Sequence, residues 1–237
     1  PLSFSASPFF EFTREFMNLE PEAWSLRWYR QMVGISSIGD TTVVSNKWML
    51  GTRNSFIIGI SATFLATALG TVAALGLSRP NMPFKGTIMA VLISPMIVPL
   101  IITSAGMFFF YSKIGLTHTY LGLILAHTAL GTPFVVITVT ATLTGFDTNL
   151  IRASQSLGAD TMRTFFKVIM PLILPGVISG ALFAFITSFD EVVVVMFVGS
   201  VEQITIPKQM WAGLRQETSP VILCMATCLV FLSIALL

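Results

Sequence analysis

Residues 152–175 read "RASQSLGADTMRTFFKVIMPLILP" and place charged and polar side chains between two long apolar segments. Charged residues are costly inside hydrocarbon, at roughly 2.5–3.5 kcal/mol each near the centre of a helix on insertion scales. A simple connection between two membrane spans does not need an ordered polar helix. The segment therefore indicates contact with something on the aqueous side of a membrane.

The composition of the rest of the chain predicts an all-α membrane protein. Of its 237 residues, 54% are hydrophobic and only 10% are charged, and the mean hydropathy is +0.83. An ordinary soluble domain has about 25% charged residues, so this chain belongs to the membrane class. The net charge of +2 gives no indication of nucleic-acid binding, and we expect no nucleic acid among the partners.

Apolar stretches long enough to cross a bilayer recur along the chain. A spanning helix needs about 20 mostly apolar residues, and four complete candidates are present: 54–78, 87–111, 119–144 and 172–198. A fifth begins near Pro220 and runs to the last residue. We expect a polytopic helical bundle with about five spans in this chain. We also expect one span before Pro1, because the chain starts without a methionine.

Lysine and arginine residues in short loops predict the orientation of the bundle, because they concentrate on the cytoplasmic side. The loops after the first and third spans carry five: Arg79, Lys85, Arg152, Arg163 and Lys167. The opposite short loops carry three: Lys113, Lys208 and Arg215. We therefore predict a transmembrane domain over 51–237 with a cytoplasmic loop at 146–171, and an outer-side N-terminal segment over 1–50. Four basic residues in that segment count against this orientation, although long segments carry little weight in the rule.

Small residues and prolines within the spans predict how the helices pack. Small side chains recur every four residues in two spans, at Ala62, Ala66, Gly70 and Ala74 and at Gly176, Gly180 and Ala184. This spacing lets helix backbones approach closely. Prolines interrupt the spans at positions 95, 99 and 133. We interpret them as helix kinks in preference to the borders of a transport pathway.

The polar segment contains the signals of two short helices joined by a corner. Asp147 is placed to cap a helix that begins at Thr148 and runs through Leu157, because its carboxylate accepts unpaired N–H groups of the first turn. Gly158 suits the left-handed position after a helix end. Asp160 then caps a second helix, which we expect Pro171 to end.

The first of these helices has a face that suits a socket on another protein. Ile151, Ser154, Leu157 and Gly158 fall on or near one face, whereas Arg152 points elsewhere. Small side chains at 153 and 154 leave room for a partner surface to come close. A free loop between spans has no reason to combine such a face with two caps.

The residues of this segment resemble the EAA loop of binding-protein-dependent ABC importer permeases. The family pattern is Glu-Ala-Ala, three residues, Gly, nine residues, Ile, one residue and Leu-Pro. Four positions match at full spacing: Ala153, Gly158, Val168 and Pro171. Three positions differ, with Arg152 for Glu, Ser154 for the second Ala and Met170 for Leu.

The resemblance implies that the first helix is a coupling helix, which inserts into a groove of a separate ATPase. The residues to which this ATPase-coupling role carries over are Arg152, Ala153, Ser154, Leu157, Gly158, Asp160 and Pro171. Where the family has an acid, Arg152 reverses the charge. Either the ATPase has compensated for this reversal, or that contact is absent here.

A wider resemblance covers the chain from about residue 20 to its end. "HTALGTPFVVITVTATLTGFD", "SFDEVVVVMFV" and "ITIPKQMW" are similar to the spermidine/putrescine (polyamine) permease subgroup. It implies a multi-pass protein of the bacterial inner membrane that moves polyamines into the cytoplasm. The implied partners are two cytoplasmic ATPase subunits, a second permease subunit (a paralogue), an extracytoplasmic substrate-binding protein and membrane lipid.

Asp190 and Glu191 are the candidate residues of a substrate pathway. They lie in a run that is otherwise apolar from 172 to 198, apart from Ser and Thr. Acids in such a run indicate function, because they are expensive unless they face a cavity or a cation. Two acids would attract the ammonium groups of a polyamine. The alternative is a structural role, in which one acid caps a helix starting at Val192 or forms an internal ion pair.

The chain lacks the phosphate loop G-x-x-x-x-G-K-[ST], so we expect it to be a translocation subunit and not an enzyme. No catalytic residue and no cofactor are expected in this chain, because a partner ATPase would bind ATP and Mg. No metal site is expected either. Cys224 and Cys228 are interpreted as packing residues on one helix face, and His118 and His127 as local hydrogen-bonding groups.

Other functions fit parts of this pattern. An ion-gradient-driven secondary transporter has broken helices and acids within its spans, but we find no internal repeat, and the capped polar helices are then unexplained. A structural membrane scaffold would not need Asp190 and Glu191. Within the ABC family, another small solute such as an organophosphonate or a metal chelate is a possible cargo.

Overall fold

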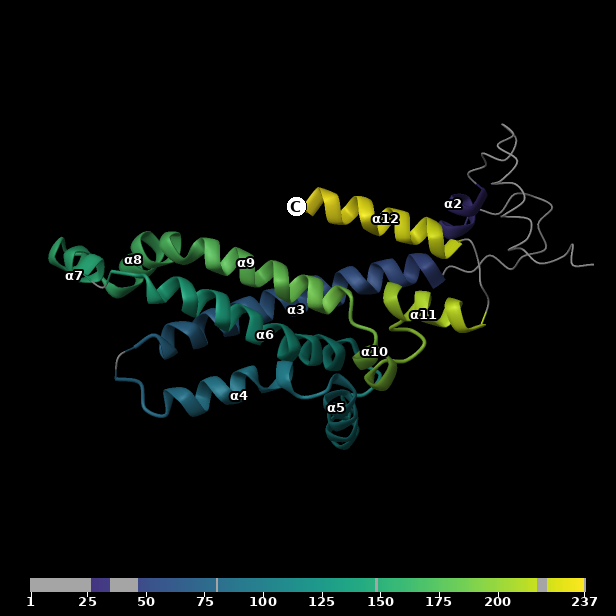
Figure 1. The fold of residues 1–237 in the computed structure, drawn as a ribbon, viewed down its shortest axis with the longest axis horizontal. Coiled ribbons are helices and arrows are strands. Elements are labelled where there is room, and N and C mark those ends of the chain that lie inside the picture. The colour runs from purple at the N-terminus through teal and green to yellow at the C-terminus, as the bar shows by residue number, and fades with distance from the viewer. Residues whose placement is uncertain (1–26, 35–46, 80, 148, 217–220, 237) are drawn as a thin grey trace, which may run out of the picture. The chain divides into compact units, whose positions relative to one another are not determined.

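The computed structural model describes residues 27–34, 47–79, 81–147, 149–216 and 221–236 (Figure 1). Within these ranges the regular structure is entirely helical. The predicted all-α membrane bundle is thus confirmed. The chain forms two compact units, one of Phe56–Gln203 and one that combines Pro1–Ser55 with Ile204–Leu237. The division into segments 1–50 and 51–237 stays a prediction.

Among the described residues, three helices are long and apolar enough to cross a membrane: α3 (Lys47–Leu77), α6 (Tyr120–Thr144) and the helix Thr161–Phe189. The first two match the expected spans 54–78 and 119–144 to within one residue at Leu77 and Tyr120, although α3 begins seven residues earlier, at Lys47. Thr119 is the N-cap of α6, and its hydroxyl accepts the N–H of Gly122 at 3.0 Å. With one bent helix pair counted as a span and the shorter α12 added, the structure agrees roughly with the five predicted spans.

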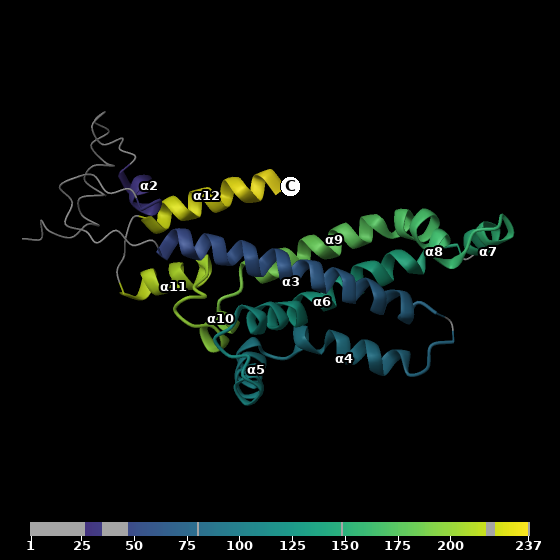
Figure 2. The ribbon, with the colours of Figure 1, turned by 180° about the vertical axis from the view of Figure 1, so that it is seen from behind.

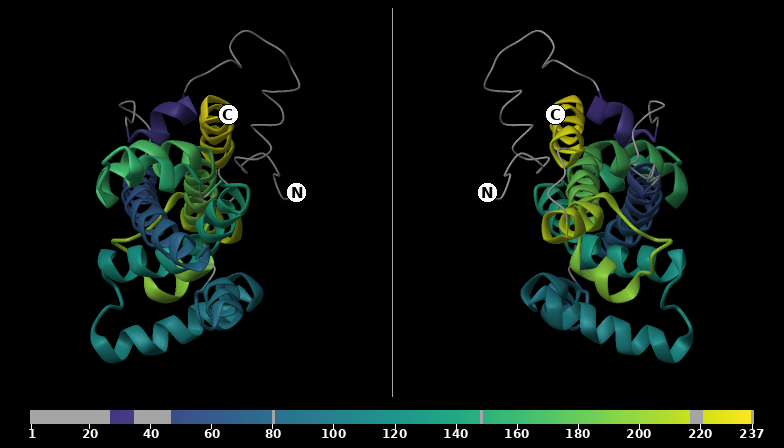
Figure 3. Two further views of the ribbon diagram at one scale, coloured as in Figure 1. Left: turned by 90° about the vertical axis from the view of Figure 1, so that its left-hand side faces the viewer. Right: turned by 90° about the vertical axis from the view of Figure 1, so that its right-hand side faces the viewer.

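The expected span 87–111 is broken into two helices that meet at 103°, which is a much sharper bend than a helix kink. They are α4 (Lys85–Ile97) and α5 (Leu100–Ile114), and Figure 3 shows α5 running across the direction of α4. Pro99 causes the break. It has no N–H to continue the helix, and it favours the extended conformation that Val98 adopts, with φ −73° and ψ 133°. Pro95 lies inside α4 without ending it.

Within the larger unit, residues 56–77 of α3 run beside α6 and α9 (Met170–Phe189), as Figures 1 and 2 show. Small residues make this possible, as the sequence predicts. A Cβ added to Gly70 would lie 2.6 Å from the Cβ of Val135 on α6, and one added to Gly180 would lie 2.8 Å from the Cα of Val135. Larger side chains at these positions would force the helices apart, at a typical cost of about 1–3 kcal/mol.

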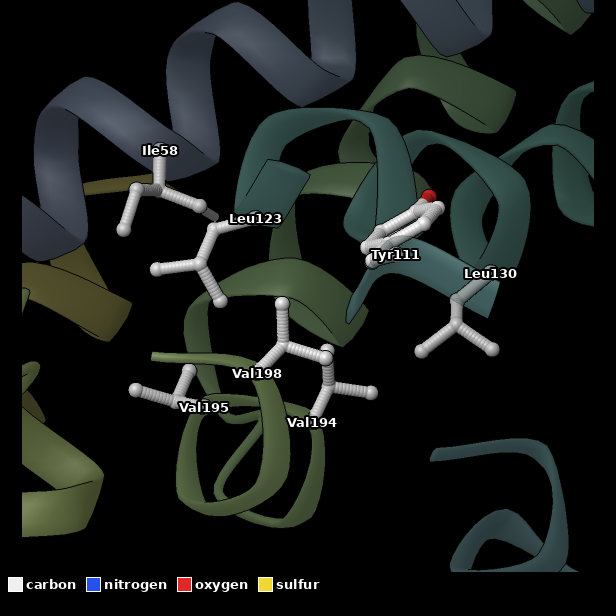
Figure 4. Close-up of a cluster of buried hydrophobic side chains, with 8 residues drawn as sticks. Ile58, Tyr111, Leu123, Leu130, Val194, Val195 and Val198 are labelled. Atoms are coloured by element: carbon white, nitrogen blue, oxygen red, sulfur yellow. The ribbon is translucent and has the colours of Figure 1, made fainter. Parts of the chain in front are cut away.

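A second cluster of apolar side chains joins α5, α6 and the short helix α10 (Val193–Val198) (Figure 4). Leu123 of α6 is fully buried there, together with Val194, Val195 and Val198 of α10. The N–H of His118 donates a hydrogen bond to the Val198 carbonyl at 2.8 Å. These contacts fix α10 against α5 and α6, which end at Ile114 and Thr144, well before α10 in the sequence.

The helix Thr161–Phe189 differs from two predictions made from the sequence. It passes through Pro171, which was expected to end a helix, and it ends at Phe189, so the expected span 172–198 is shifted. The chain continues from α8 (Thr161–Thr164) through a π-helical turn, η3 (Phe165–Ile169), into α9. The N–H of Met170 bonds to the carbonyl of Phe165, five residues back. This wider turn accommodates a proline, which cannot supply its own α-helical hydrogen bond.

The smaller unit contains the start of α3 with α2 (Arg27–Met32), α11 (Ile206–Gln216) and α12 (Val221–Leu236). The side-chain amide of Asn54 donates to the Ile204 carbonyl at 2.8 Å, and the Ser55 hydroxyl accepts the N–H of Ile206 at 2.9 Å. These two bonds tie the start of α11 to α3. Cys224 and Cys228 of α12 are free thiols, and Cys224 is buried, which agrees with a packing role.

Candidate coupling loop and carboxylate pair

The first helix of the predicted coupling loop is α7, Asn149–Ser156. The Asp147 carboxylate accepts the N–H of Asn149 at 2.9 Å, and its carbonyl accepts the N–H of Leu150 at 3.1 Å. Asp147 therefore caps this helix as the sequence predicts. The helix ends at Ser156, one residue before the expected end.

Gly158 forms the corner after α7, with a φ of +82°. Its N–H bonds to the carbonyl of Gln155 at 2.9 Å, and the N–H of Ala159 bonds to the carbonyl of Ser154 at 3.1 Å. This pair of bonds is the Schellman motif, which satisfies the last carbonyls of a helix and places a glycine in the left-handed region. The predicted role of Gly158 as a corner is confirmed.

The second helix starts at Asp160, which is the predicted cap. Its carboxylate accepts the N–H of Arg163 at 2.8 Å. The hydroxyls of Ser154 and Thr164 share a hydrogen bond of 2.7 Å, which links α7 to α8. Two caps, a glycine corner and this link together hold the two helices at a defined angle.

Most side chains of the predicted coupling set point into solvent. The exposed members are Arg152, Ala153, Leu157, Gly158, Asp160 and Pro171. Leu157 is 89% exposed, which is unusual for a large apolar residue next to polar ones. Ser154 differs, because it is half-buried and its hydroxyl faces Thr164 inside the loop. The exposed surface of the loop is thus apolar at Leu157 and basic at Arg152.

Asp190 and Glu191 lie at the C-terminal end of the helix Thr161–Phe189, in the break between α9 and α10. The two acids differ in their surroundings. The N–H of Asp190 closes α9 by bonding to the Ile186 carbonyl at 3.0 Å, and its side chain is exposed. Glu191 is only 7% exposed, and its carboxylate accepts the N–H of Val194 at 3.0 Å. Glu191 therefore has the capping role that the sequence left open between the two acids. Asp190 is the acid whose carboxylate faces outward.

The interpretation of His127 as a hydrogen-bonding group is confirmed, but its partner is not local in the sequence. His127 is 1% exposed on α6, and its Nδ1 shares a hydrogen bond of 2.7 Å with the hydroxyl of Ser188 on α9. Its Nε2 is buried with no hydrogen-bond partner in the described part of the chain. The only signal in the sequence was a histidine inside an apolar span, which indicates function without naming a partner.

In the described ranges, no group of three or more His, Cys, Asp or Glu residues is arranged to hold a metal ion.

Residues 66–237 match the family described as binding-protein-dependent transport system inner membrane component. The chain belongs to this family and is a multi-pass component of the inner membrane. The match includes both the coupling loop and the carboxylate pair, so the resemblance found in the sequence is confirmed.

Among curated proteins, the chain is similar to the spermidine/putrescine transport system permease protein PotC of Haemophilus influenzae. The two are 28% identical over 225 residues, which cover 95% of this chain and 84% of the relative. It is also 28% identical over 214 residues to the putrescine transport system permease protein PotI of Escherichia coli K12, covering 86% and 72% of the two chains.

Two solved structures share the fold. The inward-facing MetNI methionine ABC transporter aligns with a TM-score of 0.62 at 23% identity, covering 78% of this chain and 87% of that one. A bacterial ABC transporter involved in the import of the acidic polysaccharide alginate aligns with a TM-score of 0.58 at 13% identity, covering 90% and 82%. At these identities the likeness supports the fold and no detail of function.

Proposed function

We propose that this chain is the permease subunit of an ATP-driven ABC importer that moves polyamines into the cytoplasm. Family membership and the names of the relatives support the transport class and the cargo. The observation that carries the proposal is the loop from Asp147 to Thr164, in which two capped helices meet at Gly158 and present Leu157 to solvent.

In this proposal, α7 inserts into a groove of a cytoplasmic ATPase. Two ATPase subunits bind ATP and Mg and supply the hydrolysis. Leu157 would enter an apolar site in the groove, since burying a leucine side chain contributes about 1.5–3 kcal/mol. Closure of the ATPase pair would displace the Gly158 corner. The bond between Ser154 and Thr164 would pass this displacement to the helix Thr161–Phe189.

The outward-facing carboxylate of Asp190 would attract the ammonium groups of spermidine or putrescine where that helix ends. Glu191 would hold the start of α10 in place through its bond to Val194. A second permease chain, a paralogue, would close the other side of the pathway. An extracytoplasmic binding protein would deliver the cargo.

Uptake of radiolabelled spermidine into vesicles that contain the complete transporter tests this proposal. We expect uptake to require ATP inside the vesicles and to persist when an uncoupler collapses ion gradients. Uptake that stops with the uncoupler and continues without ATP would instead show a secondary transporter. ATP-dependent uptake of an organophosphonate but not of spermidine would retain the importer and remove the polyamine assignment.

A further inference from the structure

The hydrogen bond between His127 and Ser188 is a directional side-chain contact between the packed helices α6 and α9. His127 lies on α6 and Ser188 on α9, 61 residues apart. Both are buried, at 1% and 6% exposure. Nearby, Gly131 of α6 packs against Ala184 of α9, where an added Cβ would lie 3.0 Å from the Ala184 Cβ.

Small residues such as Gly131 already select the faces on which α6 and α9 approach closely, and the hydrogen bond adds a directional contact at the last turn of α9. A buried imidazole needs a partner, since an unpaired polar group in an apolar interior is costly. The distance of 2.7 Å between Nδ1 and the hydroxyl oxygen requires that Ser188 face α6. The hydrogen bond therefore selects one rotation of α9 about its axis at this turn.

Ser188 lies in the last turn of α9, directly before the carboxylate pair. The helix closes with the bond from the Asp190 N–H to the Ile186 carbonyl, and Phe189 is its last residue. Each residue of an α-helix advances the side-chain direction by about 100°. The direction of Ser188 thus determines the direction in which the carboxylate of Asp190 leaves the helix.

We propose that His127 is a positioning residue for transport: through Ser188 it fixes the last turn of α9 and so orients the Asp190 carboxylate toward the cationic substrate. This inference rests on the proposed function. His127 acts through Nδ1 and is enclosed by protein, so it does not bind the substrate itself.

Replacement of His127 by Asn and by Gln distinguishes its two ring nitrogens. Asn carries a polar atom close to the position of Nδ1, whereas Gln carries one close to that of Nε2. We expect His127→Asn to retain most of the maximal spermidine uptake of the complete transporter. His127→Gln and His127→Ala should each lower it about three- to tenfold, the size expected for one lost hydrogen bond.

Uptake is expressed per inserted transporter, and Thr132→Val on α6 is the matched control. Its hydroxyl bonds to the Thr128 carbonyl of its own helix at 2.7 Å and makes no link of this kind to α9, so uptake should be unchanged. If His127→Ala fails to insert, Ser188→Ala carries the test, because it removes a single oxygen atom from the same bond.

The Asp190→Asn background separates positioning from general stability. If His127 acts by orienting that carboxylate, His127→Ala should cause no further loss once the charge is gone. Equal losses in both backgrounds would show a structural role and overturn the proposal. Rescue by Gln in place of Asn would overturn it too, because Nε2 would then be the functional atom.

The outcomes also separate this inference from the proposed function. Normal uptake in His127→Ala together with impaired uptake in Asp190→Asn overturns only the positioning role. Normal uptake in Asp190→Asn removes the acid from the pathway, and the positioning role with it. Loss of ATP dependence in the unaltered transporter contradicts the importer itself.

Discussion

The two ends of the helix Thr161–Phe189 are stabilised in different ways. At the end near Gly158, the contacts are local: Asp160 caps the N–H three residues ahead, and Ser154 meets Thr164 ten residues away. At the other end, Ser188 is held by His127, 61 residues away. The loop end is therefore a self-supporting element exposed to solvent, whereas the carboxylate end depends on the packing of the whole bundle.

This difference separates two kinds of failure. In the proposed importer, damage to the loop end should separate a well-folded permease from the ATPase. Damage at the carboxylate end should change the passage of cationic substrate while ATPase contact is retained.

The largest expected effect is that of Gly158→Val. A β-branched residue at φ +82° costs about 1–3 kcal/mol of backbone strain, although no other atom lies within 4 Å of the added Cβ. We expect ATP hydrolysis to continue while spermidine uptake falls about tenfold or more. Gly145→Val is the control, because Gly145 has an ordinary φ of −89° and open surroundings. Equal uptake in the two variants would contradict a coupling role for the corner.

A smaller effect is expected for the double variant Asp190→Asn and Glu191→Gln. Both replacements keep oxygen acceptors, so the bond from Val194 to residue 191 is retained while the negative charge is lost. We expect spermidine uptake to fall about five- to tenfold, which corresponds to about 1–1.4 kcal/mol of lost charge interaction with the substrate. Crosslinking of the ATPase from a cysteine at position 157 should be unchanged. Wild-type uptake kinetics would exclude both acids from the pathway.

The smallest effect is expected for Asp160→Ala, which removes the cap of α8. Loss of such a cap lowers the stability of the helix by about 1 kcal/mol. We expect this to favour local opening of the loop without unfolding the bundle. Hydrogen exchange at the Arg163 amide should accelerate about fivefold. Asp160→Asn, which also caps helices, should restore protection. Unchanged exchange in the alanine variant would show that the loop is held by other contacts.

The same contrast explains how much was predictable from sequence. Asp147, Gly158 and Asp160 act on backbone groups within three residues, so their residue types and spacing were sufficient. The partner of His127 depends on which helices pack together, and no local pattern contains that information. The functions of the exposed Arg152 and of Asp190 stay predictions, because both depend on molecules outside this chain.

Pro99 and Pro171 show a second limit on what could be predicted from the sequence. Pro99 turns the chain by 103°, because Val98 before it is extended and α4 has already ended. Pro171 leaves its helix continuous, because the π turn before it removes the conflict with the preceding carbonyl. Both are prolines in apolar stretches of the sequence, and the sequence predicted a helix kink at the first and a helix end at the second. The backbone around each proline decided the outcome.

The π turn Phe165–Ile169 has a practical consequence for anyone who draws this helix as a wheel. A π turn contains one residue more than an α turn, so side chains after it lag by about 100° relative to an uninterrupted count. Thr164 and Gly176, twelve positions apart, would appear about 120° apart on an ordinary wheel, whereas the extra residue brings them to about 20°. Both are buried. Cysteine-scanning plans for α9 should therefore restart the angular count at Met170, or lipid-facing and protein-facing positions will be exchanged.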